Sequence, residues 1–482
     1  MKKINKNNIF KGFKSALSCI CFLSILVLLI IRSYDILSWK DIMADYLSPV
    51  NQLNATKEDS IDVVFMGSSH TYCSIAPSVL WNQTGIASFN MTTSGQDKDS
   101  TYHYLVELLK TQSPEIVFVE LWGLTFDYQM FEGNEHRNMM GMPLSENSLA
   151  LIDDYMKNEE RNMAYKLRWP VIHTRYKELD LYDFVNYELN EYGREADLHY
   201  ESTFAHHPVE SLEVMTPDEL TETNRAWIES LYQLSLDEDF EIIFFIAPTV
   251  ISTVEQAQIN AVAQFADEHD VPFFDCNRLA EDIGLDYHTD FLDHYHLNGY
   301  GATKLTKYFG KFLTKNYDLN DYRGNEDYKQ WDDSYTRYVQ VKDTFELKQC
   351  ETFDLYIQKL FEMDYIKCIV SFEGTYKQTI SPRYIAWMLG LSDEDFEKGG
   401  TFIIENGKVT HIMDNTSTDV YLEELTKYST LKIQNMNLVD PSATNNQDIM
   451  VNMDVVGTHH NGVNFVIYDT FRNEVVDIRG FE

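Results

Sequence analysis

One stretch constrains the fold of this chain more than any other: the apolar run Ile61–Met66, which is followed by Gly67-Ser68-Ser69-His70. The run has the length and composition of a strand buried on both faces, as in parallel sheets. A glycine directly after such a strand lets the backbone turn sharply, and the next side chains then lie at the carboxyl edge of the sheet. Ligands and nucleophiles gather at this edge in open α/β folds, so the sequence predicts that Ser69 lies there.

Further apolar runs of strand length alternate with segments of helical spacing. The predicted strands are Ile86–Met91, Glu115–Leu121, Glu241–Ala247 and Val271–Phe274, and the clearest helices are Asn224–Leu236 and Ala302–Leu313. This alternation predicts an α/β domain over residues 61–317, in which helices cover both faces of a parallel sheet to give three layers.

Residues 125–215 interrupt this alternation and are rich in Met, Tyr, His and charged residues. An insertion of this length between core strands is expected to cap a site or to bind substrate. Within it, His173 and Arg175 are candidates for contact with an anionic or sugar ligand. The alternative is a helical excursion on the surface with no role in binding.

A second polar stretch, Asp290–Gly301, lies far downstream and contains Asp293 and His296 at a spacing of three residues. A serine hydroxyl is a poor nucleophile until a base removes its proton, and the base needs a carboxylate to hold its tautomer. Ser69, His296 and Asp293 could supply these three parts, with Asp290 and His294 as the alternative acid and base. His70 is expected to diverge from Ser69 at the turn and to face substrate.

Together the two stretches resemble the SGNH/GDSL hydrolase superfamily. In that family a Gly-Asp-Ser block carries the nucleophile, and a late Asp-x-x-His block carries the acid and base. Here the blocks read Gly67-Ser68-Ser69 and Asp293-His294-Tyr295-His296-Leu297-Asn298. Serine in place of aspartate in the first block is similar to membrane-anchored members that acylate cell-surface polymers, such as those of D-alanyl transfer to teichoic acids and of alginate O-acetylation. The resemblance covers residues 60–315.

The resemblance also implies an oxyanion hole, and here the chain departs from the family pattern. Gly95, after the predicted second strand, matches the glycine whose amide the family uses; a turn glycine is the alternative. The family's third block, Gly-x-Asn-Asp, is replaced by Glu120-Leu121-Trp122-Gly123, which offers no asparagine. We therefore expect the amides of Ser69 and Gly95 to form the hole, with any third donor unassigned.

The N-terminus has the pattern of an uncleaved signal anchor. Residues 1–14 are polar and basic, and residues 15–32 form an apolar span in which 15–31 carry no charge. No small-x-small cleavage site follows the span. Five lysines precede it, which predicts a cytoplasmic N-terminus and an extracellular body on a bacterial cell membrane. Residues 33–60 are expected to be a juxtamembrane linker.

The composition of the body excludes some classes of partner and cofactor. Beyond residue 32 the chain has 33 basic and 76 acidic residues, a formal net charge of −43, which excludes sequence-independent binding of nucleic acid. Six scattered cysteines form no metal-type pair, and a 350–368 disulfide has no further support. Because the chain also lacks a Gly-rich phosphate loop and a metal cluster, we expect no cofactor and no metal.

The amino-acid composition of the chain changes after residue 317. Residues 318–345 are polar, acidic and tyrosine-rich and are predicted to be a linker, followed by a smaller α+β domain over 346–482. Its patterns predict a helix at Phe353–Phe361, a strand at Tyr365–Phe372 and a hairpin around Asn406-Gly407. The pieces Asp354–Phe372 and Gly462–Glu482 are similar to ILEI-type lectin-like domains, which implies glycan binding.

Two classes of function follow from these observations. The first is a serine acyltransferase or esterase that transfers or removes O-acetyl groups on cell-surface polysaccharide. A transferase would need acyl groups from the cytosol, and hence a multi-pass membrane acyltransferase as its partner. The second is a non-catalytic surface protein that binds glycan or supports assembly and retains the SGNH fold. The Ser…Asp-x-x-His set favours the enzyme, and the absent asparagine block favours the second class.

Overall fold

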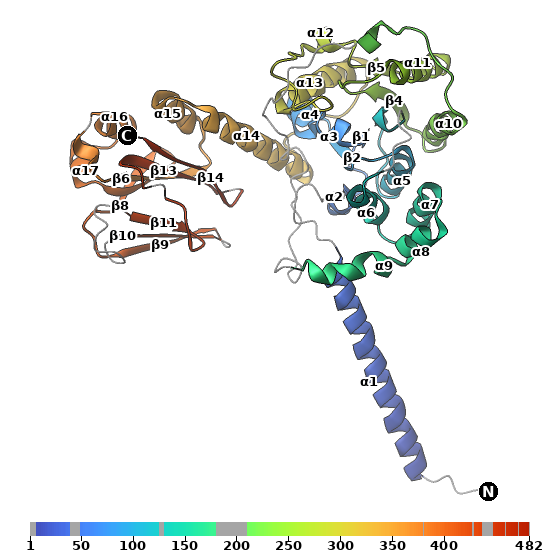
Figure 1. Ribbon diagram of the computed structural model, residues 1–482, viewed down its shortest axis with the longest axis horizontal. Coiled ribbons are helices and arrows are strands. Elements are labelled where there is room, and N and C mark those ends of the chain that lie inside the picture. The colour runs from blue at the N-terminus through green and yellow to red at the C-terminus, as the bar shows by residue number, and fades with distance from the viewer. Residues whose placement is uncertain are drawn as a thin grey trace. The chain divides into compact units, whose positions relative to one another are not determined.

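The structure is a computed structural model that describes residues 6–38, 49–124, 130–179, 210–378, 380–426, 429–435, 447–457, 459–470 and 472–481. The chain divides into two compact units, Met1–Tyr335 and Thr336–Glu482. The first contains an N-terminal helix and a mixed α/β fold, and the second is built on antiparallel sheets (Figure 1).

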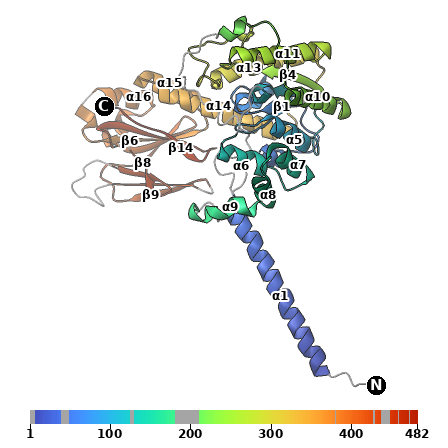
Figure 2. The same ribbon diagram turned by 45° about the vertical axis from the view of Figure 1, so that its right-hand side comes forward.

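The N-terminal helix α1 spans Lys6–Leu37. Its segment Ala16–Leu37 has a mean hydropathy of 2.4 and no buried part, so the helix is long and apolar enough to cross a membrane. The end of α1 lies beside α9, Trp169–Ile172, in both views of the ribbon (Figures 1 and 2). There the rings of Tyr34 and Trp169 meet edge to face at 6.2 Å.

Five parallel strands form the sheet of the first unit, in the order β2-β1-β3-β4-β5. They are β1 Val63–Gly67, β2 Ser88–Thr92, β3 Ile116–Glu120, β4 Glu241–Ile246 and β5 Phe273–Asp275. Each lies within two residues of its predicted position. Because all five strands run in one direction, their carboxyl ends meet at a single edge of the sheet, the edge at which Ser69 was predicted.

Alternate residues of each strand belong to different apolar cores, as the pleat of a strand requires. Val64 and Met66 of β1 join a core with side chains of α2, Pro49–Ala55; α5, Lys98–Leu108; and α10, Glu222–Asp237. Val63 and Phe65 join a second core with side chains of α4, Pro77–Thr84, and α13, Gly299–Asn316. The unit also contains α11 Thr253–Glu268, whose Val262 and Phe265 join the first core, and the short elements α3 Ser69–Tyr72, η2 Trp122–Leu124 and α12 Ala280–Ile283.

Two predicted segments are more ordered than the sequence suggested. The predicted linker 33–60 includes the end of α1 and helix α2, whose Val50 and Leu53 are buried in the first core. The insertion folds into α6 Glu132–Met140, α7 Glu146–Tyr155, α8 Glu159–Leu167, α9, η3 His173–Lys177 and η6 Glu210–Glu213. Apolar residues of α6, α7 and α8 join the same core, so the described part of the insertion is integral to the unit.

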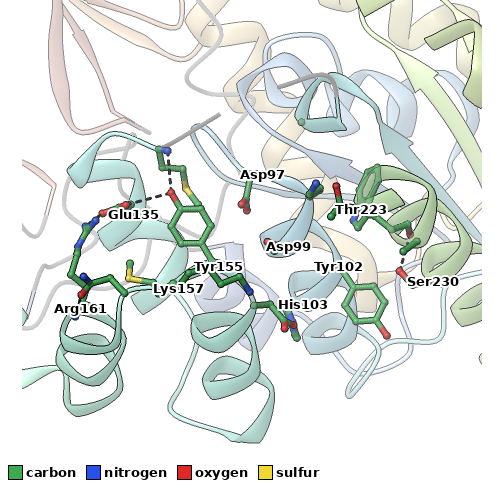
Figure 3. Close-up of a pocket in the computed structure, with 18 of the residues that line it drawn as sticks. Asp97, Asp99, Tyr102, His103, Glu135, Tyr155, Lys157, Arg161, Thr223 and Ser230 are labelled. Atoms are coloured by element: carbon green, nitrogen blue, oxygen red, sulfur yellow. Dashed lines mark hydrogen bonds and ion pairs between the residues drawn. The ribbon is translucent and has the colours of Figure 1, made fainter. Parts of the chain in front are cut away.

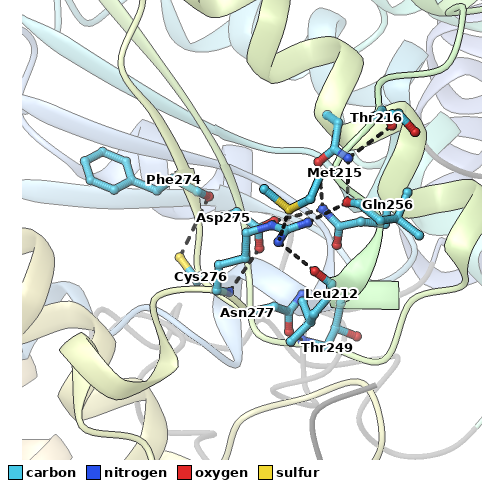
Figure 4. A network of polar contacts seen from close by, with 12 residues as sticks. Leu212, Met215, Thr216, Thr249, Gln256, Phe274, Asp275, Cys276 and Asn277 are labelled. Atoms are coloured by element: carbon cyan, nitrogen blue, oxygen red, sulfur yellow. Dashed lines mark hydrogen bonds and ion pairs between the residues drawn. The ribbon is translucent and has the colours of Figure 1, made fainter. Parts of the chain in front are cut away.

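A polar network supports the loops at the carboxyl ends of β4 and β5 (Figure 4). Asp275 accepts hydrogen bonds from Gln256 Nε2 at 2.9 Å and Arg278 Nε at 3.0 Å. Asn277 Oδ1 accepts from the backbone amide of Thr249 at 2.9 Å. The next amide, of Val250, donates to the carbonyl of His294 at 3.1 Å. The network therefore connects the sheet edge to the loop that carries the predicted acid and base.

The second unit contains two antiparallel sheets. One has the order β14-β13-β6-β7-β8 and the other β12-β11-β10-β9. The strands are β6 Ile366–Glu373, β7 Gly400–Glu405, β8 Lys408–Met413, β9 Val420–Thr426, β10 Ser429–Asn435, β11 Gln447–Val451, β12 Asp454–Val455, β13 Gly462–Asp469 and β14 Glu474–Phe481. The predicted Asn406-Gly407 hairpin is confirmed: both residues have positive φ, and β7 pairs with β8.

The remaining helices follow the first unit's α/β fold in sequence. Helix η7, Glu326–Tyr328, and the start of α14, Lys329–Gln349, belong to the first unit. The second unit contains the rest of α14 and the helices α15 Phe353–Glu362, η8 Tyr376–Gln378, α16 Ser381–Met388 and α17 Asp393–Lys398. Helix α14 occupies the second half of the predicted linker 318–345, and its Trp331 is buried in the first core; the division between the units, after Tyr335, lies within this stretch. Cys350 and Cys368 are both free thiols, so the 350–368 disulfide is absent.

Candidate functional site

Ser69 occupies the first position of α3, immediately beyond the end of β1. Ser68 caps this helix, and its hydroxyl accepts a hydrogen bond from the backbone amide of His70 at 3.3 Å. Gly67 has φ +140°, and a Cβ at this position would lie 2.4 Å from Thr71 Oγ1 and 2.9 Å from Glu120 Cβ. Only glycine fits this turn, and the turn directs Ser69 to the carboxyl edge of the sheet.

The structure brings Ser69, His296 and Asp293 into one chain of hydrogen bonds. His296 Nε2 lies 2.9 Å from Ser69 Oγ, and His296 Nδ1 lies 3.0 Å from both carboxylate oxygens of Asp293. A carboxylate can only accept, so Nδ1 carries a proton and Nε2 is free to accept the proton of Ser69. This arrangement is the one that activates a serine hydroxyl as a nucleophile.

The loop that carries the acid and base is held by its own backbone. Asp293 Oδ1 accepts from the amides of Tyr295 at 2.7 Å and His296 at 2.9 Å, and Phe291 and Leu297 form an antiparallel bridge across the loop. Burial opposes ionisation of Asp293, but the hydrogen bonds from the His296 side chain and from the backbone outweigh it and lower the pKa of Asp293 to about 2. Asp293 is therefore an anion throughout the physiological range.

The alternative acid and base do not form a pair. Asp290 is buried, 1% exposed, and its carboxylate contacts Lys304 Nζ at 2.6 Å. It also accepts a hydrogen bond from the amide of Asp286 at 2.7 Å, so its role is to hold the loop to α13. His294 and His288 are exposed. Geometry thus selects Asp293 and His296 over Asp290 and His294.

His70 lies behind the base, and the expectation that it faces substrate is wrong. Its side chain is buried, 1% exposed, and stacks on Trp122 with ring centroids 4.5 Å apart. On the other side it meets the ring of His296 at 5.1 Å. Burial, and then the neighbouring His296, lower the pKa of His70 well below its ordinary value. A neutral His70 and Trp122 therefore form an apolar wall that fixes the position of His296.

Gly95 lies in the turn after β2, with φ +61°. In the part of the chain that the structure describes, neither its amide nor that of Ser69 donates to a protein acceptor, as an oxyanion hole requires. The turn is fixed by α6. Asn138, fully buried, accepts from Thr93 Oγ1 and donates from Nδ2 to Ser94 O at 3.2 Å. Asn134 also packs directly on Gly95.

Glu120 occupies the region where the resemblance would place an asparagine block. It is 2% exposed and accepts hydrogen bonds from the amides of Trp122 at 3.0 Å and Ala247 at 3.3 Å. Glu120 therefore connects the ends of β3 and β4. Burial raises its pKa to about 8, against the smaller opposing effect of these two amides.

His173 and Arg175, the residues of the insertion predicted to contact a ligand, lie on η3 beside the end of α1. Arg175 Nη1 donates to the carbonyls of Leu37 at 3.1 Å and Ser38 at 2.7 Å. These carbonyls end a helix, where an arginine satisfies acceptors that lack an intrahelical partner. His173 is exposed and its Nδ1 contacts the carbonyl of Pro170 at 2.8 Å. Arg175 thus attaches the end of α1 to the insertion, whereas the contact of His173 lies within the insertion.

Trp122, Asn138 and Glu120 are the site residues that sequence reasoning missed. Each acts through a contact with a residue distant in sequence or with the backbone, so no pattern of neighbouring residues in the sequence predicts its role. Among the described residues no group of three or more His, Cys, Asp or Glu side chains could hold a metal ion.

The chemistry of the site must be interpreted from its geometry. No protein-family model matches this chain, and no curated protein matches it in sequence.

Proposed function

We propose that the protein is a serine acyltransferase or esterase of the SGNH type, with the three-layer fold of that superfamily, which acts on O-acetyl groups of a cell-surface polysaccharide. The hydrogen-bonded chain from Ser69 through His296 to Asp293 is the observation that carries the proposal. The parallel five-stranded sheet, with Ser69 at its carboxyl edge, supports the assignment because that is where such folds place their nucleophiles.

In the proposed reaction, Ser69 Oγ attacks the carbonyl carbon of the acyl donor while His296 Nε2 takes the hydroxyl proton. Asp293 stabilises the imidazolium that forms, and the amides of Ser69 and Gly95 stabilise the developing oxyanion. His296 then returns the proton to the leaving alcohol, which leaves an acyl group on Ser69. A sugar hydroxyl or water, deprotonated by His296, attacks that ester and regenerates the free serine.

The proposed setting is the outer face of a bacterial cell membrane, with α1 as the anchor and the N-terminus in the cytoplasm. The lysine-rich start of the chain and the apolar segment Ala16–Leu37 support this orientation. Protease added to intact protoplasts should then digest both units, and survival of the second unit would contradict the topology. For the transferase, a multi-pass membrane acyltransferase is the proposed acyl donor, and the C-terminal unit is proposed to bind glycan.

The test uses the full chain in detergent and needs no knowledge of the natural polymer. The protein should release p-nitrophenol from its acetate ester and should form a covalent adduct with an aromatic sulfonyl fluoride, mapped by mass spectrometry to Ser69. Ser69→Ala should abolish both, by about three orders of magnitude or more in rate, because the parts of such a triad act as one unit.

Two controls sharpen the result. His294→Ala changes an exposed histidine two residues from the base and should leave turnover nearly intact, whereas His296→Ala should abolish it. Ser68→Ala removes the neighbouring hydroxyl and should retain most activity. An adduct on another residue would refute the assignment of Ser69. Absence of both adduct and turnover, with normal surface acetylation in Ser69→Ala cells, would favour a non-catalytic glycan-binding protein.

A further inference from the structure

A large cavity opens between the insertion and the helices of the α/β fold (Figure 3). Its volume is about 1120 Å³, at the upper end of the range for ligand sites in proteins. Its walls come from α5, from α6 to α8 and from α10, with the loops after β2 and β3 at one side. The sequence led to the expectation that the insertion caps a site or binds substrate, but no pattern located this cavity, because its walls also include α5 and α10 outside the insertion.

The cavity borders the site of Ser69 through two shared loops. Gly123 lines the cavity, and its neighbour Trp122 stacks on His70 beside the base. Asp97, which also lines the cavity, follows two residues after Gly95. The two loops touch, because a Cβ on Gly123 would lie 3.2 Å from the carbonyl oxygen of Gln96. A polymer held in the cavity would therefore lie next to the proposed oxyanion hole.

Acidic side chains outnumber basic ones in the lining, and the basic ones are engaged. Arg161 pairs with Glu135, Lys98 Nζ donates to Asn224 Oδ1 at 3.0 Å, and Lys157 Nζ donates to the carbonyl of Asp153 at 3.2 Å. The remaining polar pair joins His103 Nε2 to Asp154 at 2.9 Å. None of these basic groups lies within 4.0 Å of the two carboxylates of the β2–α5 turn, Asp97 and Asp99, although the charge of Lys98 still acts on both and that of Lys157 on Asp99.

Asp97 and Asp99 are the two acidic groups of the lining for which the described residues supply no cation within 4.0 Å. The others have one: Glu135 has Arg161, Asp154 has His103, and the exposed Glu132 lies 3.9 Å from His136. Asp97 is 8% exposed and accepts from the amide of Ser100 at 2.9 Å, with the Ser100 side chain as a further donor, but no cation pairs with it. In Figure 3 both carboxylates lie in view between the rings of Tyr155 and Tyr102. Carboxylates that lie in or near a low-dielectric cavity without a cation are costly, and a bound cation would relieve that cost.

Other properties of the cavity agree with a cationic ligand. Burial, and then the charge of Asp99, raise the pKa of Asp97 to about 6, and burial raises the pKa of Asp99 as well. A protonated amine beside them would favour their ionised forms. Aromatic rings of Tyr102, Tyr155 and Trp227 offer faces for ring packing and cation–π contact. A polyanion would instead meet uncompensated carboxylates and a body with net charge −43.

We propose that this cavity binds the acceptor polysaccharide of the proposed reaction, and that the polysaccharide carries free, protonated amino groups that pair with Asp97 and Asp99. The proposal rests on the proposed function for the claim that the ligand is the acceptor. The ligand class itself, an amino sugar polymer, rests on the size, charge and aromatic lining of the cavity.

The experiment measures binding of three hexasaccharides to the full-length Ser69→Ala protein in detergent by calorimetry at pH 6. The probes are the glucosamine hexamer, its fully N-acetylated counterpart and a galacturonate hexamer. We expect the glucosamine hexamer to bind at least about tenfold more tightly than the acetylated one, and the galacturonate hexamer to show no binding.

Substitution then locates the site. Asp97→Asn with Asp99→Asn removes two charges while asparagine keeps the helix cap of α5, and should weaken glucosamine binding by about tenfold or more. Glu229→Gln with Glu238→Gln makes the same charge change at exposed positions on α10 and directly after its end, and should leave binding unchanged. Equal binding of the first two hexamers, or no effect of the Asp97 and Asp99 substitutions, would refute the proposal.

The outcome is separable from the test of the proposed function. Binding is measured on Ser69→Ala protein, so it does not depend on turnover. Amine-dependent binding in a protein whose Ser69 forms no adduct would refute the acyl-transfer function and retain the cavity assignment. An adduct on Ser69 without amine-dependent binding would refute the cavity assignment and retain the function.

Discussion

Each of the two units holds a histidine against a carboxylate, and the two pairs differ in what the second imidazole nitrogen faces. In the first unit, Asp293 lies 3.0 Å from Nδ1 of His296, and Nε2 lies 2.9 Å from the hydroxyl of Ser69. In the second unit, Glu373 lies 3.0 Å from Nδ1 of His459, and Nε2 lies 3.6 Å from the carboxylate of Asp448. The first histidine can accept a proton from a neutral neighbour, whereas the second lies between two anions.

The difference shows that a carboxylate–histidine pair is not by itself a sign of catalysis. The hydrogen bond to Glu373 raises the pKa of His459 above its ordinary value, so the second pair stabilises a cation. The side chain of Glu373 is 2% exposed and also accepts from Ser371 Oγ at 2.9 Å. Asp293 and His296 have side-chain exposures of 44% and 22%, and a substrate can reach them. Only the first pair combines a free basic nitrogen with a nucleophile and access.

The largest expected effect comes from making the same substitution, histidine to glutamine, in each of the two pairs. His296→Gln should lower the rate of p-nitrophenyl acetate hydrolysis by about three orders of magnitude or more, because glutamine cannot accept the serine proton. His459→Gln should leave this rate within about twofold, since that histidine touches no nucleophile. Steady-state kinetics on both full-length variants decides the matter. A comparable loss of rate in His459→Gln would break the distinction between the two pairs.

The sequence predicts the reacting groups of the site better than their surroundings. Ser69, Asp293 and His296 each follow a local signature, a glycine after an apolar run or a three-residue spacing before a helix. The residues around them have no such signature. His70 is stacked on Trp122, 52 positions away, and Asn138 reaches Thr93 and Ser94 across the chain. Tertiary packing decides these contacts, and a single sequence contains no pattern that reports them.

The same limit applies to the fold. Strand positions were predicted because burial on both faces leaves continuous apolar runs, as in Glu241–Ile246. The order of the strands and the role of the insertion depend on contacts between helices distant in sequence. Helix α14 was missed because its charged and aromatic residues show weak apolar periodicity, although Trp331 and Leu347 are buried in different cores.

Glu120 extends the comparison to a buried carboxylate that has amides as partners and no histidine. Its pKa of about 8 in the folded protein lies above its ordinary value of 4.5. The folded state therefore holds a proton that the unfolded chain has lost, so the stability contributed by this proton is full below pH 4.5 and falls as pH rises toward 8. At pH 8.5 the loss should be on the order of a few kcal/mol.

Glu120→Gln tests this expectation because glutamine stays neutral. Its amide still accepts one of the two backbone hydrogen bonds, and any cost of the other is the same at every pH. Relative to the wild type, the variant should therefore gain stability steadily between pH 5 and pH 8.5, measured by denaturant unfolding of the full chain in detergent. A difference that does not change with pH would show that Glu120 is ionised when folded.

The smallest expected effect concerns the charge of His459. As with Glu120, the stability that this group contributes falls as pH rises, but here the bound proton gives a cation and not a neutral group. The pKa of this histidine is raised above 6.5 by Glu373, so the folded state binds the proton more tightly than the unfolded chain. Its contribution to stability is therefore full below pH 6.5 and is lost as pH rises through the folded value. His459→Gln should destabilise the second unit at pH 5.5 by about 1 kcal/mol, and by clearly less at pH 9.

Because His459 has φ +52°, the backbone strain of a non-glycine residue there is common to the wild type and the variant and cancels in the comparison. His460→Gln, at the exposed neighbouring position, supplies the matched control and should show no such dependence. Hydrogen exchange of the β6 and β13 amides, corrected for the intrinsic effect of pH, reports the stability of this unit within the full chain. An equal loss at both pH values would mean that the His459–Glu373 contact stabilises the fold by packing, and would leave the charge distinction between the two histidines without support.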